Sequence, residues 1–428
     1  MEPQERGLVA CVSRRSALGG TAGRRCVVTA ASQRGLSARQ WAVRQLIGAV
    51  DLTSAISLGE RVAADTARLL GVDHHQSLSS RSDLARAYEL AGRSDDAISL
   101  HESVVDDSQR VLGSDDPSTL AYRNNLADAL EAAGRSDEAI AMYEAVLSGR
   151  IRVLGGDHPD TLTTRNNLAD ALESAGRLSE AIAMYEAVIA DRTQLLGANH
   201  PDTLISRNNL ASAHESAGMI DASVTEFEKV VADQRSVIGF DHPDTLATRN
   251  NLAYVYESAG RVDEAIALYE DVLADRIRVL ASDHPDTLIT WNNLALGYLT
   301  AGRLDEAITA NETLLVARER VLGDRHPDTL TSRNNVAVAY QAAGRLDEAI
   351  AILEPLVGIR AQVLGPAHPH TLRTRHNVAN ADRLAKAPAK AVPMFLSTLA
   401  DTQRTLGSDH PLIETIRENL ALAADALN

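Results

Sequence analysis

The sequence contains few of the residues on which several common classes of protein depend. Its two cysteines, Cys11 and Cys26, lie near the start, so neither a disulfide framework nor a paired Cys-x-x-Cys metal site is available to the rest. Only three lysines occur, Lys229, Lys386 and Lys390, and none follows a glycine, which excludes the phosphate loop of an ATPase. No apolar run approaches the ~20 residues of a membrane span.

The charge is predominantly negative but unevenly distributed. The formal net charge is −16, whereas residues 1–50, with eight Arg and two Glu, carry a net charge of +6. The rest is therefore acidic enough to repel nucleic acid and anionic membranes, and we predict neither as a partner.

Residues 1–36 form a basic leader that we expect to be disordered. Ser13-Arg14-Arg15-Ser16 resembles part of a twin-arginine export signal, but glycines and arginines stand where its apolar stretch should follow. Export and a start assigned too far upstream are the alternatives. We predict a cytoplasmic protein, which suits two reduced cysteines.

A phrase of the form HPDTLxxRNNLA recurs with a fixed period of 42 residues. Positions equivalent to its arginine can be followed from Arg81 to Arg417, and no unit gains or loses a residue. Such a repeat indicates one supersecondary unit stacked on copies of itself, which predicts one long domain without a single globular core. Aromatic residues make up 3%, and the many Ala and Leu favour closely packed helices.

Each unit has the start and stop signals of two helices. In residues 158–200, His158-Pro159 opens the first helix because proline needs no N–H partner at the first helical position, and Gly176 ends it. The second helix is predicted from about Ser179 to Gly197. The positions expected to face inward recur at helical spacing: Leu162, Leu168, Ala169, Leu172, Ala175, Ala181, Ile182, Tyr185, Val188, Ile189, Leu195 and Leu196.

Trp291, Leu294, Tyr298, Gly302 and Ala307 have the spacing of a known repeat signature. The pattern resembles the tetratricopeptide repeat (TPR), in the longer variety found in kinesin light chains and many bacterial proteins; elsewhere arginine replaces the aromatic residue. The surplus over the usual period of about 34 residues corresponds to about two helical turns. The resemblance implies an all-α, right-handed superhelical α-solenoid of antiparallel helix pairs.

The ends of the array are degenerate, as capping units are. We expect nine helix pairs over residues 37–410 and a C-terminal capping helix over residues 411–428. In the last pair, Pro388 and Pro393 are expected to shorten or kink the second helix.

The most regular candidate ligands are histidines, one in each unit. A metal needs several ligands around one ion, and a position beside a helix-starting proline favours helix capping instead. We predict no catalytic residue, no metal, no cofactor and no enzyme activity. The histidines are His158, His200, His242, His284, His326, His368 and His410.

The asparagine before the repeated leucine is the candidate binding residue. The resemblance implies that it lies in the concave groove, where its amide would bond the backbone of an extended peptide. Bonding between neighbouring helices is the alternative, and both stay open. The residues are Asn125, Asn167, Asn209, Asn251, Asn293, Asn335 and Asn377, and Asp83 interrupts the row.

Selectivity is expected where the units differ. Two positions after the repeated leucine, acidic Asp128 and Asp170 are followed in later units by Tyr254, Leu296 and Val338. Five positions after it, glutamates give way to Leu299. This predicts a groove with an acidic first half and an apolar part around Trp291, Leu296, Leu299 and Val338.

A protein or extended peptide with basic residues and one apolar anchor would fit such a groove. A solvated charged surface, with Leu296 and Val338 packed between helices, is the alternative. We predict a non-enzymatic binding scaffold or, alternatively, the sensing arm of a signalling assembly whose NTPase is a separate chain.

Overall fold

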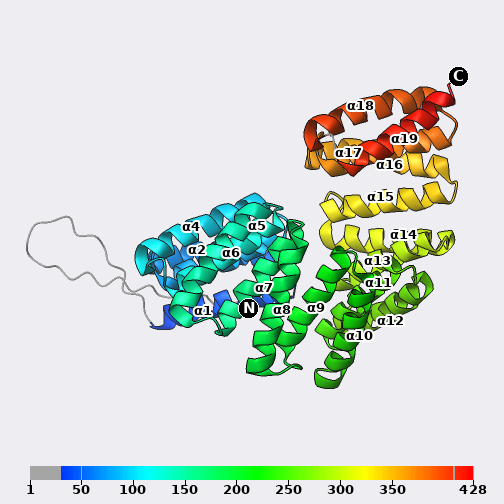
Figure 1. The fold of residues 1–428 in the computed structure, drawn as a ribbon. Coiled ribbons are helices and arrows are strands. Elements are labelled where there is room, and N and C mark those ends of the chain that lie inside the picture. Colours follow the sequence, from blue (N-terminus) through cyan, green and yellow to red (C-terminus); the bar gives the residue numbers. More distant parts are fainter. Residues whose placement is uncertain (1–29, 50, 408–409, 428) are drawn as a thin grey trace, which may run out of the picture. The chain divides into compact units, whose positions relative to one another are not determined.

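The computed structural model describes residues 30–49, 51–407 and 410–427, and the fold within these ranges consists of helices without strands (Figure 1). The prediction of an all-α solenoid of antiparallel helix pairs is confirmed, because consecutive helices within each part of the chain pack side by side. Most of the predicted leader, with Cys11 and Cys26, lies outside the described residues.

The chain divides into two compact units, residues 1–219 and 220–428, although we expected one continuous domain. In a solenoid each repeat contacts only its neighbours, so contacts never unite the whole chain. Unit 1 contains α1 (Ala30–Gly48), α2 (Leu52–Leu70), α3 (His75–Leu90), α4 (Ser94–Leu112), α5 (Pro117–Ala132), α6 (Ser136–Leu154), α7 (Pro159–Ser174), α8 (Leu178–Leu196) and α9 (Pro201–Ser216).

Unit 2 repeats the same alternation of a 16-residue first helix and a longer second helix. It contains α10 (Ile220–Val237), α11 (Pro243–Ser258), α12 (Val262–Leu280), α13 (Pro285–Thr300), α14 (Leu304–Leu322), α15 (Pro327–Ala342), α16 (Leu346–Val363), α17 (Pro369–Leu384), α18 (Pro388–Leu406) and α19 (Pro411–Asp425).

The repeated histidines cap the first helices, as predicted. In α7 the backbone N–H of Asp160 donates to Nδ1 of His158 over 3.2 Å, and the same bond recurs at the other predicted histidines. Pro159 follows at the first helical position. The preceding second helix ends at Gly155, whose φ of +93° suits glycine, and Thr161 donates to the carbonyl of Gly155 over 2.9 Å.

The core is a thin layer between the two helices of each repeat. Leu162, Leu168 and Leu172 are buried as predicted, whereas Ala175 is exposed because it caps the end of α7. The prediction was wrong for Leu195 and Leu196, which are 50% and 39% exposed. Arg192, one helical turn earlier on α8, is the buried residue instead.

A buried arginine joins each of several second helices to the next first helix. Nη1 of Arg192 lies 2.7 Å from the carbonyl oxygen of Asp202 and 2.7 Å from Oγ of Ser206. Burial lowers the pKa of Arg192, since its hydrogen-bond partners are neutral. Sequence analysis gave this position no role. Its equivalents are Arg150, Arg276, Arg318 and Arg360.

Both ends of the array differ from expectation. Helix α1 begins at Ala30, seven residues before the expected start at Ser37. Helix α18 is not shortened: it has 19 residues, like α8. Pro388 stands in its first turn, where the missing N–H would have no helical partner anyway. Pro393 lies inside the helix.

Candidate peptide-binding surface

The predicted asparagines lie along the first helices, partly buried, and five of the seven donate to the preceding first helix. Asn167 Nδ2 lies 3.2 Å from Oδ1 of Asp128, and Asn209 Nδ2 lies 3.2 Å from Oδ1 of Asp170. In unit 2, Asn377 donates to Asn334 Oδ1 over 3.0 Å. These amides hold adjacent repeats together. The other two of the five bonds join Asn125 to Ser82 and Asn335 to Asn292.

Asn251 and Asn293 are the exceptions. Both are half-buried, and neither amide takes part in a hydrogen bond within the described part of the chain. They lie on the adjacent first helices α11 and α13 of unit 2. The row of seven therefore contains two amides that are not used by the fold.

The predicted acidic residues are fixed by hydrogen bonds to neighbouring helices. Asp128 accepts from the hydroxyl of Tyr143, and Asp170 accepts from the hydroxyl of Tyr185. Burial raises the pKa of Asp128, and it raises the pKa of Asp170 to about 7. Each aspartate thus joins a second helix to two first helices.

The glutamates five positions after the repeated leucine make similar bonds. Ser174 donates to Glu131 over 3.2 Å, and Ser216 donates to Glu173 over 2.8 Å. Burial also raises the pKa values of Glu131 and Glu173. Burial thus makes these carboxyl groups harder to ionise than exposed ones, which counting charges in the sequence could not indicate.

The predicted apolar part exists on unit 2. Tyr254 on α11 is 48% exposed, and Leu296 on α13 is 49% exposed. Val338 on α15 is half-buried, as expected of a side chain that packs in part against a neighbouring helix. Ile289 lies two helical turns before Leu296 on α13 and is also exposed, at 48%. Together Tyr254, Ile289, Leu296 and Val338 form what we call the apolar row.

Trp291 does not belong to the apolar row, contrary to our expectation. Five residues at ~100° each place it roughly opposite Leu296 around α13. Trp291, Leu294 and Tyr298 instead line a cavity of about 360 Å³ against Asp305 and Thr309 of α14. The aromatic position of the repeat signature thus faces the second helix.

The arginines that replace this aromatic residue form ion pairs. Arg165 Nη1 lies 2.8 Å from Asp191, 26 residues later, and Arg249 bonds Asp275 in the same way. Where the residue 26 positions later is not acidic, the arginine donates a hydrogen bond to the residue 14 positions earlier. Thus Arg123 bonds Gln109, since Gly149 occupies the later position.

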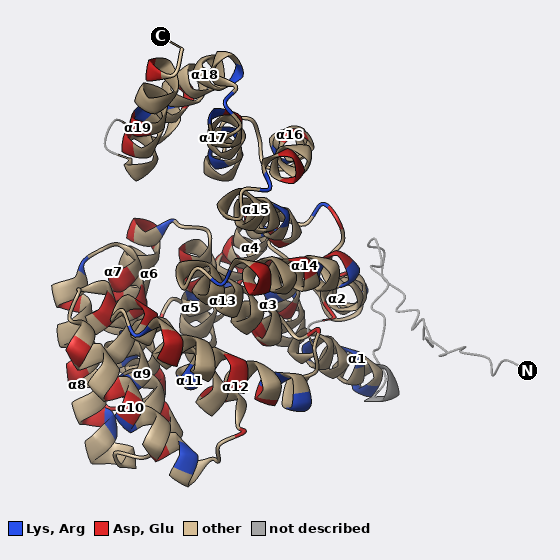
Figure 2. Cartoon of the chain, turned by 90° about the vertical axis from the view of Figure 1, so that its right-hand side faces the viewer, with Lys and Arg blue, Asp and Glu red and all other residues tan. Residues whose placement is uncertain are grey.

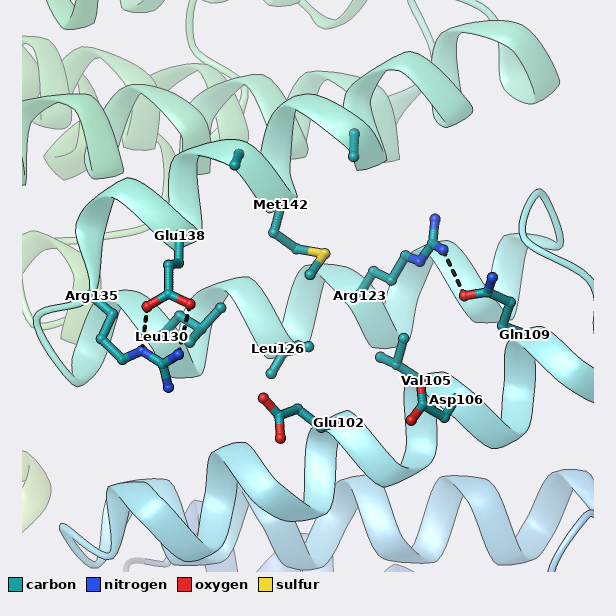
Figure 3. Close-up of a pocket in the computed structure, with 12 residues that line it drawn as sticks. Glu102, Val105, Asp106, Gln109, Arg123, Leu126, Leu130, Arg135, Glu138 and Met142 are labelled. Atoms are coloured by element: carbon teal, nitrogen blue, oxygen red, sulfur yellow. Dashed lines mark hydrogen bonds and ion pairs between the residues drawn. The ribbon is translucent and has the colours of Figure 1, made fainter.

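A larger cavity of about 710 Å³ surrounds Arg123 on unit 1 (Figure 3). Leu126 and Leu130 of α5 and Met142 of α6 supply its apolar wall, and Glu102 of α4 faces them across the space. Sequence analysis missed this cavity.

The charged residues give no indication of a metal site or a membrane span. Acidic and basic residues both occur along the helices of each unit (Figure 2). No group of three His, Cys, Asp or Glu side chains suited to a metal ion occurs within residues 30–49, 51–407 and 410–427. In the same ranges, no helix has both the length and the apolar character needed to cross a membrane.

These stacked helix pairs define an α-solenoid repeat protein. A tetratricopeptide repeat family model matches residues 91–150, 120–194, 218–278, 244–315, 286–356 and 334–403. Two further tetratricopeptide repeat models match residues 166–238 and 78–100. The chain belongs to the tetratricopeptide repeat family, as the sequence pattern predicted. No curated protein matches the sequence.

Solved structures include similar repeats. The nearly identical TPR-like repeats of a kinesin light chain candidate from Podosopora anserina share 34% identity, covering 47% of this chain and 95% of that one, with a TM-score of 0.40.

Two other structures are similar over more of the chain. A Rap protein complexed with Competence and Sporulation Factor shares 12% identity over 92% of this chain and 99% of that one, with a TM-score of 0.51. A signal transduction ATPase with a tetratricopeptide repeat sensor from Pyrococcus horikoshii shares 15% identity over 82% and 55%, with a TM-score of 0.50. At such identities the likeness is one of fold.

Proposed function

We propose that the chain is a non-enzymatic scaffold that binds an extended segment of another protein along its first helices. One observation carries the proposal. Asn251 and Asn293, whose amides make no hydrogen bond to any described residue, lie on α11 and α13, the same helices that expose Tyr254 and Leu296. An amide offers a donor and an acceptor to a peptide backbone, and an apolar side chain beside it can hold an anchor residue.

The other five asparagines differ from Asn251 and Asn293, which supports a structural role for the five and a ligand-binding role for the two. Asn125, Asn167, Asn209, Asn335 and Asn377 use their amides to join first helices, whereas within the described residues Asn251 and Asn293 do not. A similarly folded Rap protein has been solved in complex with Competence and Sporulation Factor, which is compatible with ligand binding by such an array. The partner predicted from the charge pattern is a peptide with basic residues and one apolar anchor.

The test compares two matched substitutions in the full chain. An array of defined 12-residue peptides, each with lysines or arginines around one Leu or Phe, is titrated against the wild type and Asn251→Ala/Asn293→Ala. We expect the double variant to lose about tenfold or more in affinity with unchanged thermal stability.

Asn335→Ala is the control, because it removes an amide that bonds Asn292. It should lower stability while leaving peptide affinity nearly unchanged. A peptide that binds the wild type and keeps its full affinity for the double variant would contradict the role of the two amides.

A second candidate function is that of a sensing arm for a separate NTPase. The observation that favours it is the likeness of fold to the signal transduction ATPase that carries a tetratricopeptide repeat sensor. To test this, the full chain, with and without a bound peptide, would be added to an NTPase whose gene neighbours the gene for this chain. A peptide-dependent change in hydrolysis rate would support this function, and an unchanged rate would count against it.

A further inference from the structure

The buried histidine His101 on α4 has an unsatisfied side chain in the wall of a polar cavity of unit 1. Its exposed fraction is 1%, and within the described residues neither ring nitrogen has a hydrogen-bond partner. Burial and the positive charge of Arg86 lower the pKa of His101 to about 4. The neutral ring therefore offers one N–H donor and one acceptor nitrogen, and leaving both unpaired is costly.

The cavity arises where two residues of the repeat are replaced together. At the position of His101 the next two repeats have Tyr143 and Tyr185, whose hydroxyls donate to the aspartates 15 positions earlier. Fifteen positions before His101 stands Arg86 instead of aspartate. The tyrosine–aspartate bond is thus absent, and a cavity of about 300 Å³ lies between α3, α4 and α5.

Three carboxylates and one guanidinium group line this cavity. Two of the carboxylates have a cationic partner. Glu89 lies 2.6 Å from Nη1 of Arg86, and Asp83 lies 3.0 Å from Nε of Arg44. An anionic ligand would have to compete with Glu89 for Arg86, so the cavity does not favour an anion.

Asp128, the third carboxylate, receives hydrogen bonds from neutral groups only in the described part of the chain. Its donors are the hydroxyl of Tyr143 and the amides of Asn124 and Asn167. Among the described residues Arg86 acts on Asp128 only through space, without a hydrogen bond, so a cation that enters the cavity can bond the carboxylate directly. The side-chain amide nitrogen of Asn125 donates to Ser82 over 3.2 Å, which leaves the side-chain oxygen of Asn125 as an acceptor beside the cavity.

We propose that this cavity binds a primary ammonium group. The assignment of this group to the lysine side chain of a partner peptide rests on the proposed function. The ammonium group has three donors. The acceptor nitrogen of His101, the oxygen of Asn125 and the carboxylate of Asp128 can each take one. The lysine would then be an anchor residue bound by unit 1.

The test uses the full chain and the double variant Arg86→Asp/His101→Tyr. This variant restores the tyrosine–aspartate pair of the next two repeats, so it should fold, and the tyrosine ring fills the cavity. The probes are N-acetyl-lysine N-methylamide, its norleucine analogue and n-pentylamine. Binding is followed by calorimetry and by the side-chain ¹⁵N signals of His101.

We expect the lysine probe to bind the wild type about tenfold or more tightly than the norleucine probe and to shift the His101 signals. The double variant should bind it about tenfold more weakly, although the variant has gained negative charge. Equal or tighter binding by the variant would overturn the proposal, because it would indicate general attraction to an acidic surface. Binding of n-pentylamine without the lysine probe would overturn the assignment to a peptide.

The two proposals fail in different ways. If basic peptides bind with affinities that depend on Asn251 and Asn293 but not on His101, the ammonium site is wrong and the scaffold function stands. If the lysine probe binds at His101 while no peptide binds the array, the cavity stands and the peptide-binding function fails.

Discussion

Asn167 Nδ2 on α7 lies 3.2 Å from Oδ1 of Asp128 on α5, so two residues predicted to face a ligand bind each other. The bond spans two successive first helices and recurs one repeat later between Asn209 and Asp170. In unit 1 the asparagine row and the acidic series thus form one network that fixes the spacing of the repeats. A ligand of unit 1 must bind beside this network or replace parts of it.

The stability of the protein should depend on pH through Asp170, whose folded-state pKa is raised to about 7 by burial. A raised pKa means that the folded state holds a proton that the unfolded state releases near pH 4. Its contribution to the free energy of unfolding is complete below about pH 4 and is lost as the pH rises through about 7. Asp170→Asn, which cannot titrate, should therefore gain stability relative to the wild type over this range.

Urea denaturation at several pH values between 4 and 8 measures this difference. A difference for Asp170→Asn that does not change with pH would show that Asp170 titrates normally.

The buried arginines should contribute much more to stability than the exposed ones. Arg360, 1% exposed, donates to the carbonyl of His370 and the hydroxyl of Thr374. Arg360→Ala removes both hydrogen bonds and opens a cavity, so we expect a loss of about 2–4 kcal/mol. Arg404→Ala, whose side chain is 73% exposed beside Asp401, should cost less than about 1 kcal/mol. Chemical denaturation compares them, and similar losses would refute the difference.

One repeat carries an alanine where the others place glycine after the second helix. Ala281 has φ +80° and ψ 163°, a conformation that glycine adopts at Gly155 and Gly197. Ala281→Gly should relieve strain and stabilise the protein by about 1 kcal/mol. In Ala301→Gly, at an αR position after α13, the added backbone freedom should instead cost about 0.5–1 kcal/mol. Thermal unfolding measures the change in stability of both variants. A loss of stability in Ala281→Gly would contradict the idea that Ala281 is strained.

The apolar row can be tested without disturbing the core. Leu296→Asp puts a charge on the row, so we expect it to weaken binding of an apolar-anchored peptide by about tenfold or more. Val316→Asp, on α14 and 66% exposed, is the matched control, which should leave affinity unchanged. Calorimetry with the tightest peptide of the array compares the variants. Equal effects of the two substitutions would exclude the row as the anchor site.

The sequence was sufficient to predict the repeat, its helices and their caps, because these depend on local rules. A His-Pro pair such as His158-Pro159 starts a helix whatever surrounds it. A glycine such as Gly155 ends one because it can adopt a positive φ. The inward leucines follow from helical periodicity alone.

The partners of polar side chains could not be predicted in the same way. Arg192 looks like a surface residue in the sequence, and only the approach of α9 shows that its guanidinium group is buried. The unequal use of the asparagines likewise depends on whether a neighbouring first helix offers an acceptor. Asn292 is the acceptor for Asn335, whereas Asn251 has none among the described residues.

The constant spacing of the buried arginine bonds has a consequence for how such a protein can change length. Arg150 bonds the carbonyl 10 residues later and the hydroxyl 14 residues later, and Arg192 does the same. If residues 159–200 were excised, Asp202 and Ser206 would stand at those same distances from Arg150. Loss or gain of one whole repeat between two such arginines would thus leave the joint with the same hydrogen-bond partners.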